Sequence, residues 1–407
     1  MSTDTKASSH NRPTRLVLIG IGGYGHFYIE HIRALHAQGV AKLSAVVDPR
    51  PELSPDWPEV QQLGIPVYAT LEEYLSKETP AELAIICSPI PYHADQTCAA
   101  LAAGMHVLCE KPIAATLADG QRMQAAADAR PDLFLEIAYQ WSFSRAIQSL
   151  KHDILQGELG APLRLRTRVA WPRDKAYYTR NNWTGCIQTP QGQPVFDSPV
   201  SNATAHYLHN MLYLCGPTIA QSARPLRMEA ECYRANPIET FDAACCRLTL
   251  DNKAELIFYT AHCVELEDGP HFCFEFENGT VSYSNGTELR AVFKDGSERN
   301  YGKPGDDTMR KLDICAARCR QPSPDICPPA AAMAHTLCVR GFQEVTPHVF
   351  KPEQLQIKGE PGASPLTYLP EMNQAMIDAY DTGKLFSENA TTWAMPAQSI
   401  DLTSLQP

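Results

Sequence analysis

The sequence predicts an α/β protein with two parts. The first is an N-terminal doubly wound parallel sheet, and the second is an α+β domain with a large, mostly antiparallel open sheet. Three observations support this. An apolar run near the N-terminus ends in a glycine-rich turn, short apolar runs then alternate with helix-like segments, and later alternating runs are separated by Asn-Gly and Asp-Gly pairs. Strand–helix alternation predicts a parallel sheet covered on both faces, whereas Asn-Gly and Asp-Gly turns are typical of hairpins.

The length and composition fit two globular domains. The chain has 407 residues, of which 44% are hydrophobic and 20% are charged. This is about twice the length of a typical domain. We expect a flexible leader at residues 1–14, a first domain at residues 15–140, a second domain at residues 141–390, and a C-terminal tail at residues 391–407.

Charge and cysteine usage narrow the classes of partner. The net charge of -11 argues against a nucleic-acid partner, because a groove for phosphates carries positive charge. No apolar run approaches the roughly 20 residues of a membrane-spanning helix, and the N-terminus lacks the apolar core of a secretory signal. Most of the 14 cysteines lie in apolar runs and none forms a C-x-x-C pair. We therefore expect a cytoplasmic protein with reduced thiols, no membrane partner and no metal.

The first predicted strand, residues 15–20, ends in the motif GIGGYG ahead of a helix-like segment. This is the G-x-G-x-x-G pattern in the strand–turn–helix context of dinucleotide binding. Gly20 allows the tight turn, Gly22 lets the backbone approach a pyrophosphate, and Gly25 permits close packing of the helix on the strand. The helix N-terminus adds a positive dipole end. The predicted cofactor contacts in this turn are Gly20, Gly22, Gly23, Tyr24 and Gly25.

The second predicted strand, residues 42–47, is followed by Asp48 at about the expected distance from the glycine turn. A carboxylate there would accept hydrogen bonds from the adenosine ribose hydroxyls and would repel the 2′-phosphate of NADP. The nearby Arg50 could reverse that preference. NAD is therefore the expected cofactor, with NADP left open.

The elements that follow alternate between strand and helix, at residues 66–70, 71–78, 81–89, 92–104, 105–112, 116–129 and 133–140. In such sheets, ligands bind beyond the carboxyl ends of the strands. Two segments with polar side chains fall there, one with Ser88 and His93 and one with Glu110 and Lys111. We expect His93 to lie beside the cofactor, with helix capping or packing as an equal alternative.

Beyond residue 140 the pattern changes to one helix-like stretch at residues 144–160 and then to hairpin-rich runs. In the run HFCFEFE, Phe272, Phe274 and Phe276 point one way, which predicts one apolar face. The opposite face meets either solvent or another subunit. Two further helices are expected at residues 306–320 and 328–345.

The longest irregular stretch is the loop at residues 171–201, which contains two tryptophans and two tyrosines. Loops longer than roughly 15 residues inside compact domains are usually functional or disordered, and this one is too aromatic for disorder. Aromatic faces beside Arg, Asn and Asp suit a polyhydroxylated ring. Packing between domains is an equal alternative.

The run SNATAHYLHN at residues 201–210 gathers three polar side chains among small residues. If the run is helical, Asn202 and His206 share a face and His209 lies one turn beyond. His206 and His209 form a His-x-x-His pair, but two imidazoles without a nearby carboxylate or thiolate make a weak zinc site.

The order of these features resembles the Gfo/Idh/MocA family, named for glucose–fructose oxidoreductase and inositol dehydrogenase. The matching segments are GIGGYG at 20–25, Asp48, SPIPYHADQTCAALAAGMHVLCEKP at 88–112, and ATAHYLHNMLYLCG at 203–216. The resemblance implies an N-terminal Rossmann domain and a C-terminal domain whose open sheet often builds homodimers or homotetramers. It also implies NAD or NADP chemistry on a sugar, cyclitol or related polyol.

By the same resemblance, Lys111 is the lysine placed near the nicotinamide and the reacting hydroxyl, and His206 is the acid/base. These roles suit the chemistry, because oxidation of a carbinol needs a proton acceptor with a pKa near neutrality and a cation for the developing alkoxide. His209 is expected to support His206. The predicted substrate contacts are Tyr139, Trp141, Tyr178, Arg180, Trp183 and His209, with Tyr177 also plausible.

One residue departs from the family's pattern. Asn202 stands where family members often carry aspartate, and it adds no negative charge to support an imidazolium. Three hypotheses remain open: a sugar or cyclitol dehydrogenase with Lys111, His206 and Asn202 in its catalytic site, a glycosidase-like enzyme that oxidises its substrate transiently with NAD, and a non-catalytic regulator that binds NAD and a sugar.

Overall fold

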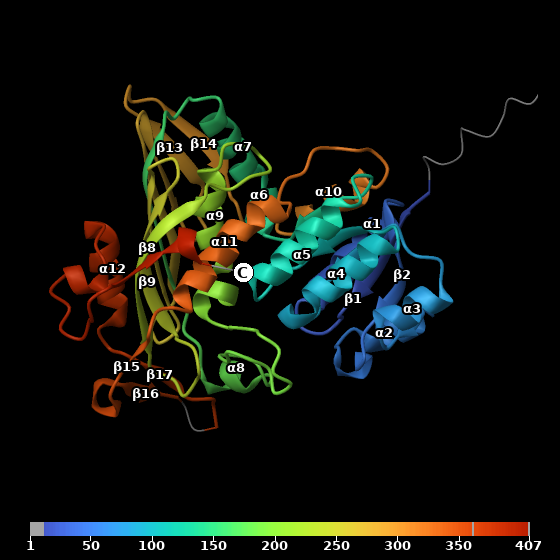
Figure 1. Ribbon diagram of the computed structural model, residues 1–407, viewed down its shortest axis with the longest axis horizontal. Coiled ribbons are helices and arrows are strands. Elements are labelled where there is room, and N and C mark those ends of the chain that lie inside the picture. The colour runs from blue at the N-terminus through green and yellow to red at the C-terminus, as the bar shows by residue number, and fades with distance from the viewer. Residues whose placement is uncertain (1–11, 360–361, 406–407) are drawn as a thin grey trace, which may run out of the picture. The chain divides into compact units, whose positions relative to one another are not determined.

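The structure is a computed structural model that describes residues 12–359 and 362–405 (Figure 1). Residues 1–11 of the expected leader lie outside the described part, and the first strand already begins at Thr14. The described chain divides into two compact units. Of the described residues, unit 1 comprises 12–114, 119–140 and 308–329, and unit 2 comprises 115–118, 141–307, 330–359 and 362–405.

Unit 1 contains a six-stranded parallel sheet in the order β3-β2-β1-β4-β5-β6. Its strands are β1 (Thr14–Ile19), β2 (Ala41–Val47), β3 (Val67–Tyr68), β4 (Leu83–Ile86), β5 (His106–Cys109) and β6 (Leu135–Ile137). This is the strand order of a Rossmann fold, in which ligands bind where the order reverses, beyond β1 and β4. The expected fold class is therefore confirmed for this part of the chain.

The helices of unit 1 follow from apolar side chains at helical spacing. On α1 (Gly25–Ala37), Tyr28, Ile29, Ile32 and Leu35 are buried against the sheet. The other helices are α2 (Trp57–Gln62), α3 (Leu71–Lys77), α4 (His93–Ala102), α5 (Leu117–Asp128) and α10 (Arg310–Arg318).

The helix α10 belongs to unit 1, although it begins at Arg310 and the preceding strand of that unit, β6, ends at Ile137. Leu312 and Cys315 are fully buried in the same apolar core as Leu16 and Ile85. Thr14 also donates a 3.0 Å hydrogen bond from Oγ1 to the backbone oxygen of Ala316. The sequence places residues 306–320 in the second domain, so this return of the chain is a feature that strand–helix alternation does not reveal.

Unit 2 is built on a ten-stranded sheet, in which β18 pairs with β8 and the other nine strands follow the order β14-β13-β12-β11-β7-β10-β9-β8-β15. The β7–β10 and β15–β8 pairs are parallel and the remaining pairs are antiparallel, as the hairpin turns predict. The strands are β7 (Pro162–Ala170), β8 (Pro225–Arg234), β9 (Ala243–Leu250), β10 (Glu255–Ala261), β11 (Asp268–Phe276), β12 (Gly279–Ser284), β13 (Leu289–Phe293), β14 (Glu298–Gly302), β15 (His348–Val349) and β18 (Gln398–Asp401).

Helices lie on both sides of this sheet. Figure 1 shows α12 on one side and α7, α9 and α11 on the other. Phe272, Phe274 and Phe276 are buried and the residues between them are partly exposed, as the alternation predicts. The helices of unit 2 are α6 (Gln140–Phe143), α7 (Arg145–Leu155), α8 (Lys175–Thr179), α9 (Ala205–Leu214), α11 (Pro329–Phe342) and α12 (Met372–Thr382), and a two-stranded sheet is formed by β16 (Gln356–Lys358) and β17 (Leu366–Tyr368).

The ends of unit 2 differ in detail from the sequence-based expectation. The helix predicted at residues 144–160 stops at Leu155, because the chain turns at Gly157 and Gly160, both at positive φ. The C-terminal segment includes β18, whose Ile400 is buried. Within the described residues, no helix combines the length and apolar character needed to cross a bilayer.

Candidate functional site

The glycine turn of unit 1 is shaped by two close backbone approaches. Gly20 has φ +87°, and a Cβ there would lie 2.9 Å from the backbone of Cys87. A Cβ on Gly25 would lie 2.4 Å from the backbone oxygen of Gly20. Both positions therefore require glycine, as the motif predicts. Gly22, Gly23 and Tyr24 between them are exposed, so the outer side of the turn is accessible to a ligand.

The turn fits the pyrophosphate of a dinucleotide. A Cβ on Gly22 would meet no heavy atom within 4 Å, so the backbone there is open to close approach. Helix α1 starts at Gly25 with no acidic residue in its first turn and no side-chain cap, so its positive dipole end is not offset locally. Gly20, Gly22, Gly23, Tyr24 and Gly25 are thus brought together as predicted.

Asp48 lies beside this turn and supports it. Its Oδ2 accepts a 2.9 Å hydrogen bond from the Ile21 backbone N–H, and its Oδ1 accepts one of 2.9 Å from the Arg50 backbone N–H. The carboxylate therefore connects the ends of β1 and β2. The Arg50 side chain is exposed. A ribose contact by Asp48, and any contact of Arg50 with a 2′-phosphate, remain predictions.

The Glu-Lys-Pro turn follows β5 and contains a buried ion pair. Glu110 Oε1 accepts hydrogen bonds from the Tyr28 hydroxyl at 2.9 Å and from the Lys311 ammonium at 2.5 Å, and Oε2 accepts the Lys111 backbone N–H at 3.1 Å. Burial favours the neutral amine of Lys311, but the Glu110 carboxylate outweighs this effect and raises its pKa. Glu110 thus fixes the backbone from which Lys111 extends.

His93 is held between two backbone carbonyls of unit 1. Its Nδ1 lies 2.9 Å from the Pro112 oxygen and its Nε2 lies 2.9 Å from the Ser88 oxygen. Burial lowers the pKa of His93, so the ring is neutral and donates through one nitrogen at a time. The ring connects the loops after β4 and β5, which corresponds to the packing alternative. The Ser88 hydroxyl donates to Gln96 at 2.5 Å.

In unit 2, the run SNATAHYLHN is not one continuous α-helix. Residues Pro199–Ala203 form a π-helical turn, and α9 starts at Ala205. Thr204, at φ −109° and ψ 12°, separates them, and its backbone N–H donates to the Pro199 oxygen at 2.8 Å. Asn202 and His206 therefore lie on opposite sides of a break, and the simple i, i+4 expectation does not hold. Such π turns are frequent at functional sites.

Asn202 is held by an aspartate that sequence reasoning missed. Its Nδ2 donates a 2.8 Å hydrogen bond to Oδ1 of Asp197, and the Gly185 backbone N–H donates to Oδ2 at 2.8 Å. Asp197 is 3% exposed. The negative charge absent from position 202 is therefore present five residues earlier. The only feature of the sequence that pointed to Asp197 was its position near the end of the aromatic loop.

The two histidines of this run have different surroundings. His206 lies in the first turn of α9 and is partly exposed, and its role as the acid/base stays a prediction. His209 is fully buried, with its Nε2 3.0 Å from the Ser142 hydroxyl and its ring stacked on Tyr213 at 5.8 Å. Burial lowers the pKa of His209 well below its usual value, and His335 and Lys151 add to this. The ring of His209 is therefore placed to support α9. The described residues contain no cluster that could hold a metal ion.

Tyr139 and Trp141, two further predicted substrate contacts, are also buried. Tyr139 is 0% exposed in unit 1, and Trp141 is 4% exposed in unit 2. The Trp141 ring packs edge-on against Tyr207, Phe272 and Tyr283 at centroid distances of 5.3 to 5.5 Å. The substrate contacts of both residues stay predictions.

The aromatic loop gathers a polar cluster in unit 2, which we define as Arg173, Tyr177, Tyr178, Arg180 and His262. The guanidinium carbons of Arg173 and Arg180 lie 4.9 and 3.8 Å from the centroid of the Tyr177 ring. Tyr177 also packs edge-on against His262, with centroids 5.6 Å apart. Tyr178 and Arg180 thus each contact Tyr177, while Trp183 donates its backbone N–H to the side-chain oxygen of Asn181.

Arg173 and His262 are members of this cluster that sequence reasoning missed. His262 directly follows β10, and Arg173 lies two residues after Trp171, whose backbone N–H donates to the last residue of β10. His262 Nδ1 lies 2.9 Å from the Trp171 oxygen. Burial, followed by the charge of Arg173, lowers the pKa of His262 to about 3, so this ring is neutral. The sequence did contain one signal for Arg173, because this cationic residue stands between the aromatic residues Trp171 and Tyr177.

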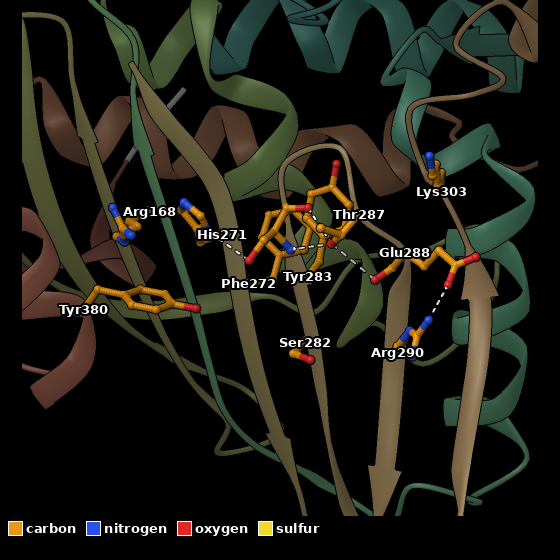
Figure 2. Close-up of a pocket in the computed structure, with 11 residues that line it drawn as sticks. Arg168, His271, Phe272, Ser282, Tyr283, Thr287, Glu288, Arg290, Lys303 and Tyr380 are labelled. Atoms are coloured by element: carbon orange, nitrogen blue, oxygen red, sulfur yellow. Dashed lines mark hydrogen bonds and ion pairs between the residues drawn. The ribbon is translucent and has the colours of Figure 1, made fainter. Parts of the chain in front are cut away.

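A hollow lies on the sheet of unit 2, with a volume of about 510 Å³ (Figure 2). Figure 2 shows Arg168, His271 and Tyr380 on one side of it and Glu288, Arg290 and Lys303 on the other. Its charges are largely matched, since Arg168 pairs with Asp268 and Arg290 lies 2.6 Å from Glu288. The hollow therefore lies on the face of the sheet where exposed polar side chains of β12 and β13 alternate with buried residues.

The amino-acid sequence of the chain is similar to those of known proteins mainly in unit 1. Residues 14–137 match the model of an oxidoreductase family described as having an NAD-binding Rossmann fold. Over 94 residues, 23% of this chain, it is 35% identical to an inositol 2-dehydrogenase of Salmonella paratyphi B, and over 160 residues, 39% of the chain, it is 28% identical to a myo-inositol 2-dehydrogenase of Thermotoga maritima. These matches span 28% and 46% of the length of the two relatives.

Solved structures resemble a larger part of the chain. The WlbA dehydrogenase of Bordetella pertussis, crystallised with NADH and UDP-GlcNAcA, has a TM-score of 0.65 at 21% identity, covering 82% of this chain and 96% of its own. An aldose-aldose oxidoreductase of Caulobacter crescentus, complexed with glycerol, has a TM-score of 0.65 at 18% identity, covering 82% and 97%. At these identities the likeness shows a shared two-part fold.

Proposed function

Because the chain belongs, through residues 14–137, to the Gfo/Idh/MocA oxidoreductase family with its NAD-binding Rossmann fold, we propose that it is a nicotinamide-dependent dehydrogenase. The reaction moves hydride between NAD and a hydroxyl carbon of a sugar, cyclitol or related polyol. The observation that carries this proposal is the exposed glycine turn at the N-terminus of α1, with Asp48 behind it. NADP is the alternative cofactor, because Arg50 is exposed.

Unit 1 supplies the dinucleotide site. The backbone of Gly22 and Gly23 would hold the pyrophosphate, the N-terminal end of α1 would offset its charge, and the Asp48 carboxylate would accept hydrogen bonds from the ribose hydroxyls. When bound, NAD supplies the hydride acceptor. Lys111 extends from the turn that Glu110 fixes, and in this proposal its ammonium orients the reacting hydroxyl and stabilises alkoxide charge.

Unit 2 supplies the proton acceptor. His206 is partly exposed at the start of α9, and in this proposal its imidazole takes the hydroxyl proton during oxidation and returns it during reduction. Asn202, held by Asp197, offers its amide oxygen to a substrate hydroxyl while its Nδ2 is engaged. Tyr178, Arg180 and Trp183 are proposed as substrate contacts from the aromatic loop.

The test measures NADH formation at 340 nm with a panel of inositols, aldoses and sugar acids, with NADP in place of NAD in parallel. We expect turnover with at least one compound, and a decrease in kcat of about 10²- to 10⁴-fold in His206→Gln and in Lys111→Ala. The exposed variant Lys77→Ala is the matched control. Cleavage of an aryl glycoside that needs NAD but yields no net NADH would instead identify the glycosidase-like mechanism, and ligand binding without any turnover would identify a regulator.

We further propose that the protein acts in the cytoplasm as a homodimer or homotetramer through the open face of the unit 2 sheet. Support comes from the strands β12 and β13, on which buried residues such as Val281 and Ala291 alternate with exposed ones. Light scattering coupled to size exclusion tests the assembly, with Ser282→Arg expected to weaken it. A monomer at micromolar concentration would contradict this assignment.

A further inference from the structure

We propose that Arg173 and Arg180 bind the carboxylate of a sugar-acid substrate, and that His262 accepts a hydrogen bond from one of its hydroxyls. The proposal rests on the proposed dehydrogenase function and names the substrate class for it. It places the recognition of the substrate's charge entirely within unit 2.

The first argument is the uncompensated charge of the two arginines. Their guanidinium groups flank the Tyr177 ring, at 4.9 Å for Arg173 and 3.8 Å for Arg180. Within residues 12–359 and 362–405, neither forms an ion pair, and the Nε of Arg173 is buried without a hydrogen-bond partner. Two guanidiniums held together without an acid are typical of a site for an anion, which both can donate to.

The aspartates of the same region are already engaged with other donors. Asp197 accepts the Gly185 backbone N–H and the Asn202 amide, and Asp174 accepts the Tyr177 backbone N–H at the start of α8. Asp242 accepts two backbone N–H groups at 2.8 and 2.9 Å, those of Asn236 and Ala235. These carboxylates are hydrogen-bonded to donors other than the two arginines, so the guanidinium groups remain available to donate to a ligand.

The second argument is an orphaned acceptor beside Arg173. His262 is 2% exposed, and its Nδ1 faces the Trp171 oxygen at 2.9 Å, which fixes Nδ1 as the protonated nitrogen. Its Nε2 is then a lone-pair acceptor, and it is buried without a partner in the described chain. Leaving a buried acceptor unsatisfied is unfavourable, and a hydrogen bond from a substrate hydroxyl would remove that penalty.

The strand pairing explains why these groups are adjacent. β7 and β10 run parallel with Ala170 opposite Ala261, so the residues after each strand continue side by side. The Arg173 backbone N–H donates to the His262 oxygen at 3.1 Å, which fixes the spacing. Guanidinium donors beside an imidazole acceptor match a carboxylate beside a hydroxyl, the arrangement found in uronic and aldonic acids.

Matched pairs of sugars test this proposal on the NAD-loaded full-length protein. Titration calorimetry compares D-glucuronate with D-glucose, D-galacturonate with D-galactose, and D-gluconate with D-glucitol. We expect the acid of at least one pair to bind about tenfold to hundredfold more tightly than its neutral partner, the range for charge-assisted hydrogen bonds. D-glucose 6-phosphate and D-galactose 6-phosphate form a separate arm, and tighter binding of a phosphate than of the matching acid would overturn the carboxylate assignment.

Variants separate the roles of the three residues. Arg180→Gln, at an exposed position, should remove most of the preference for the acid, and Arg173→Gln should do the same, while Arg224→Gln serves as the exposed control. His262→Leu should weaken acid and neutral sugar equally, because both carry the hydroxyl. Equal binding within every pair, or an acid preference that survives Arg180→Gln, overturns the proposal.

Failure of the carboxylate proposal and failure of the proposed dehydrogenase function would give different results. If the acid binds through the arginines but no NADH forms with any compound, the carboxylate site stands and the proposed dehydrogenase function fails. If NADH forms only with neutral sugars, the dehydrogenase function stands and the carboxylate proposal fails.

Discussion

The charged groups around the Glu-Lys-Pro turn of unit 1 neutralise one another, whereas those of the polar cluster in unit 2 do not. Glu110 is satisfied by Tyr28, Lys311 and a backbone N–H. Arg173 and His262 instead keep buried nitrogens without a partner among the described residues. In the first region the buried charge of Glu110 is satisfied within the protein, which makes that region a rigid support. In the second region, our proposal assigns the missing hydrogen-bond partners to the bound substrate. Substitutions in the two regions should therefore differ in what they change.

Lys311→Met should have the largest effect on stability, because it leaves the Glu110 carboxylate buried without its cation. We expect the free energy of unfolding to fall by about 3–5 kcal/mol, measured by urea unfolding. Lys77→Met, which breaks the exposed pair with Glu73, is the matched control and should leave the free energy of unfolding nearly unchanged, because solvent screens that pair. The double variant Lys311→Met with Glu110→Gln should recover part of the loss. If Lys311→Met cost no more than the control, the support would not depend on its buried pair.

Asn202→Asp should have the next largest effect, although it restores the residue that family members often carry. The Nδ2 donor to Asp197 would be lost and a second carboxylate would stand at the same position, 2.8 Å from the first. We expect a loss of about 1–3 kcal/mol in unfolding free energy, together with a decreased kcat. Asn181→Asp is the control, because there the side-chain oxygen already serves as the acceptor. A variant more active than the wild type would show that Asp197 does not replace the family's aspartate.

The same contrast explains how much of the molecule the sequence predicts. Unit 1 is largely predictable, because its glycine turn, its strand ends and the Glu-Lys-Pro turn each depend on neighbours within a few residues. Lys311 was not predicted, since its partner Glu110 lies 201 residues earlier in the chain. The spacing of apolar residues within a helix predicts that one face is buried, but it does not predict which apolar core that face joins.

The candidate site of unit 2 was less predictable for the same reason. The importance of the SNATAHYLHN run was evident, but the π turn before α9 depends on the Thr204 bond to Pro199, and periodicity gives no sign of it. The aromatic composition of the loop pointed to Tyr178 and Arg180. His262 carried no such signal, because a histidine after a buried strand reads as an ordinary core residue until its hydrogen bonds are known.

The smallest predicted effect concerns the pH dependence of stability and comes from two histidines that the fold keeps neutral. Burial lowers the pKa of His262 to about 3 and that of His209 well below its usual value. In the unfolded chain both titrate near pH 6.5. Below that pH the unfolded state therefore binds more protons than the folded state, and stability is lost as the pH falls from about 6.5 toward about 3.

As the pH falls from 6.5 to 5.5, each of these two histidines should lower the free energy of unfolding by about 1 kcal/mol, because the unfolded state alone gains the proton. Urea unfolding of His209→Gln, which keeps a side-chain nitrogen toward Ser142, should show a shallower decline by that amount for the same interval. His36→Gln, at an exposed position of α1, should leave the slope unchanged. An equal change in both variants would mean that the burial of His209 does not govern its protonation, and its role as a neutral support of α9 would then have to be abandoned.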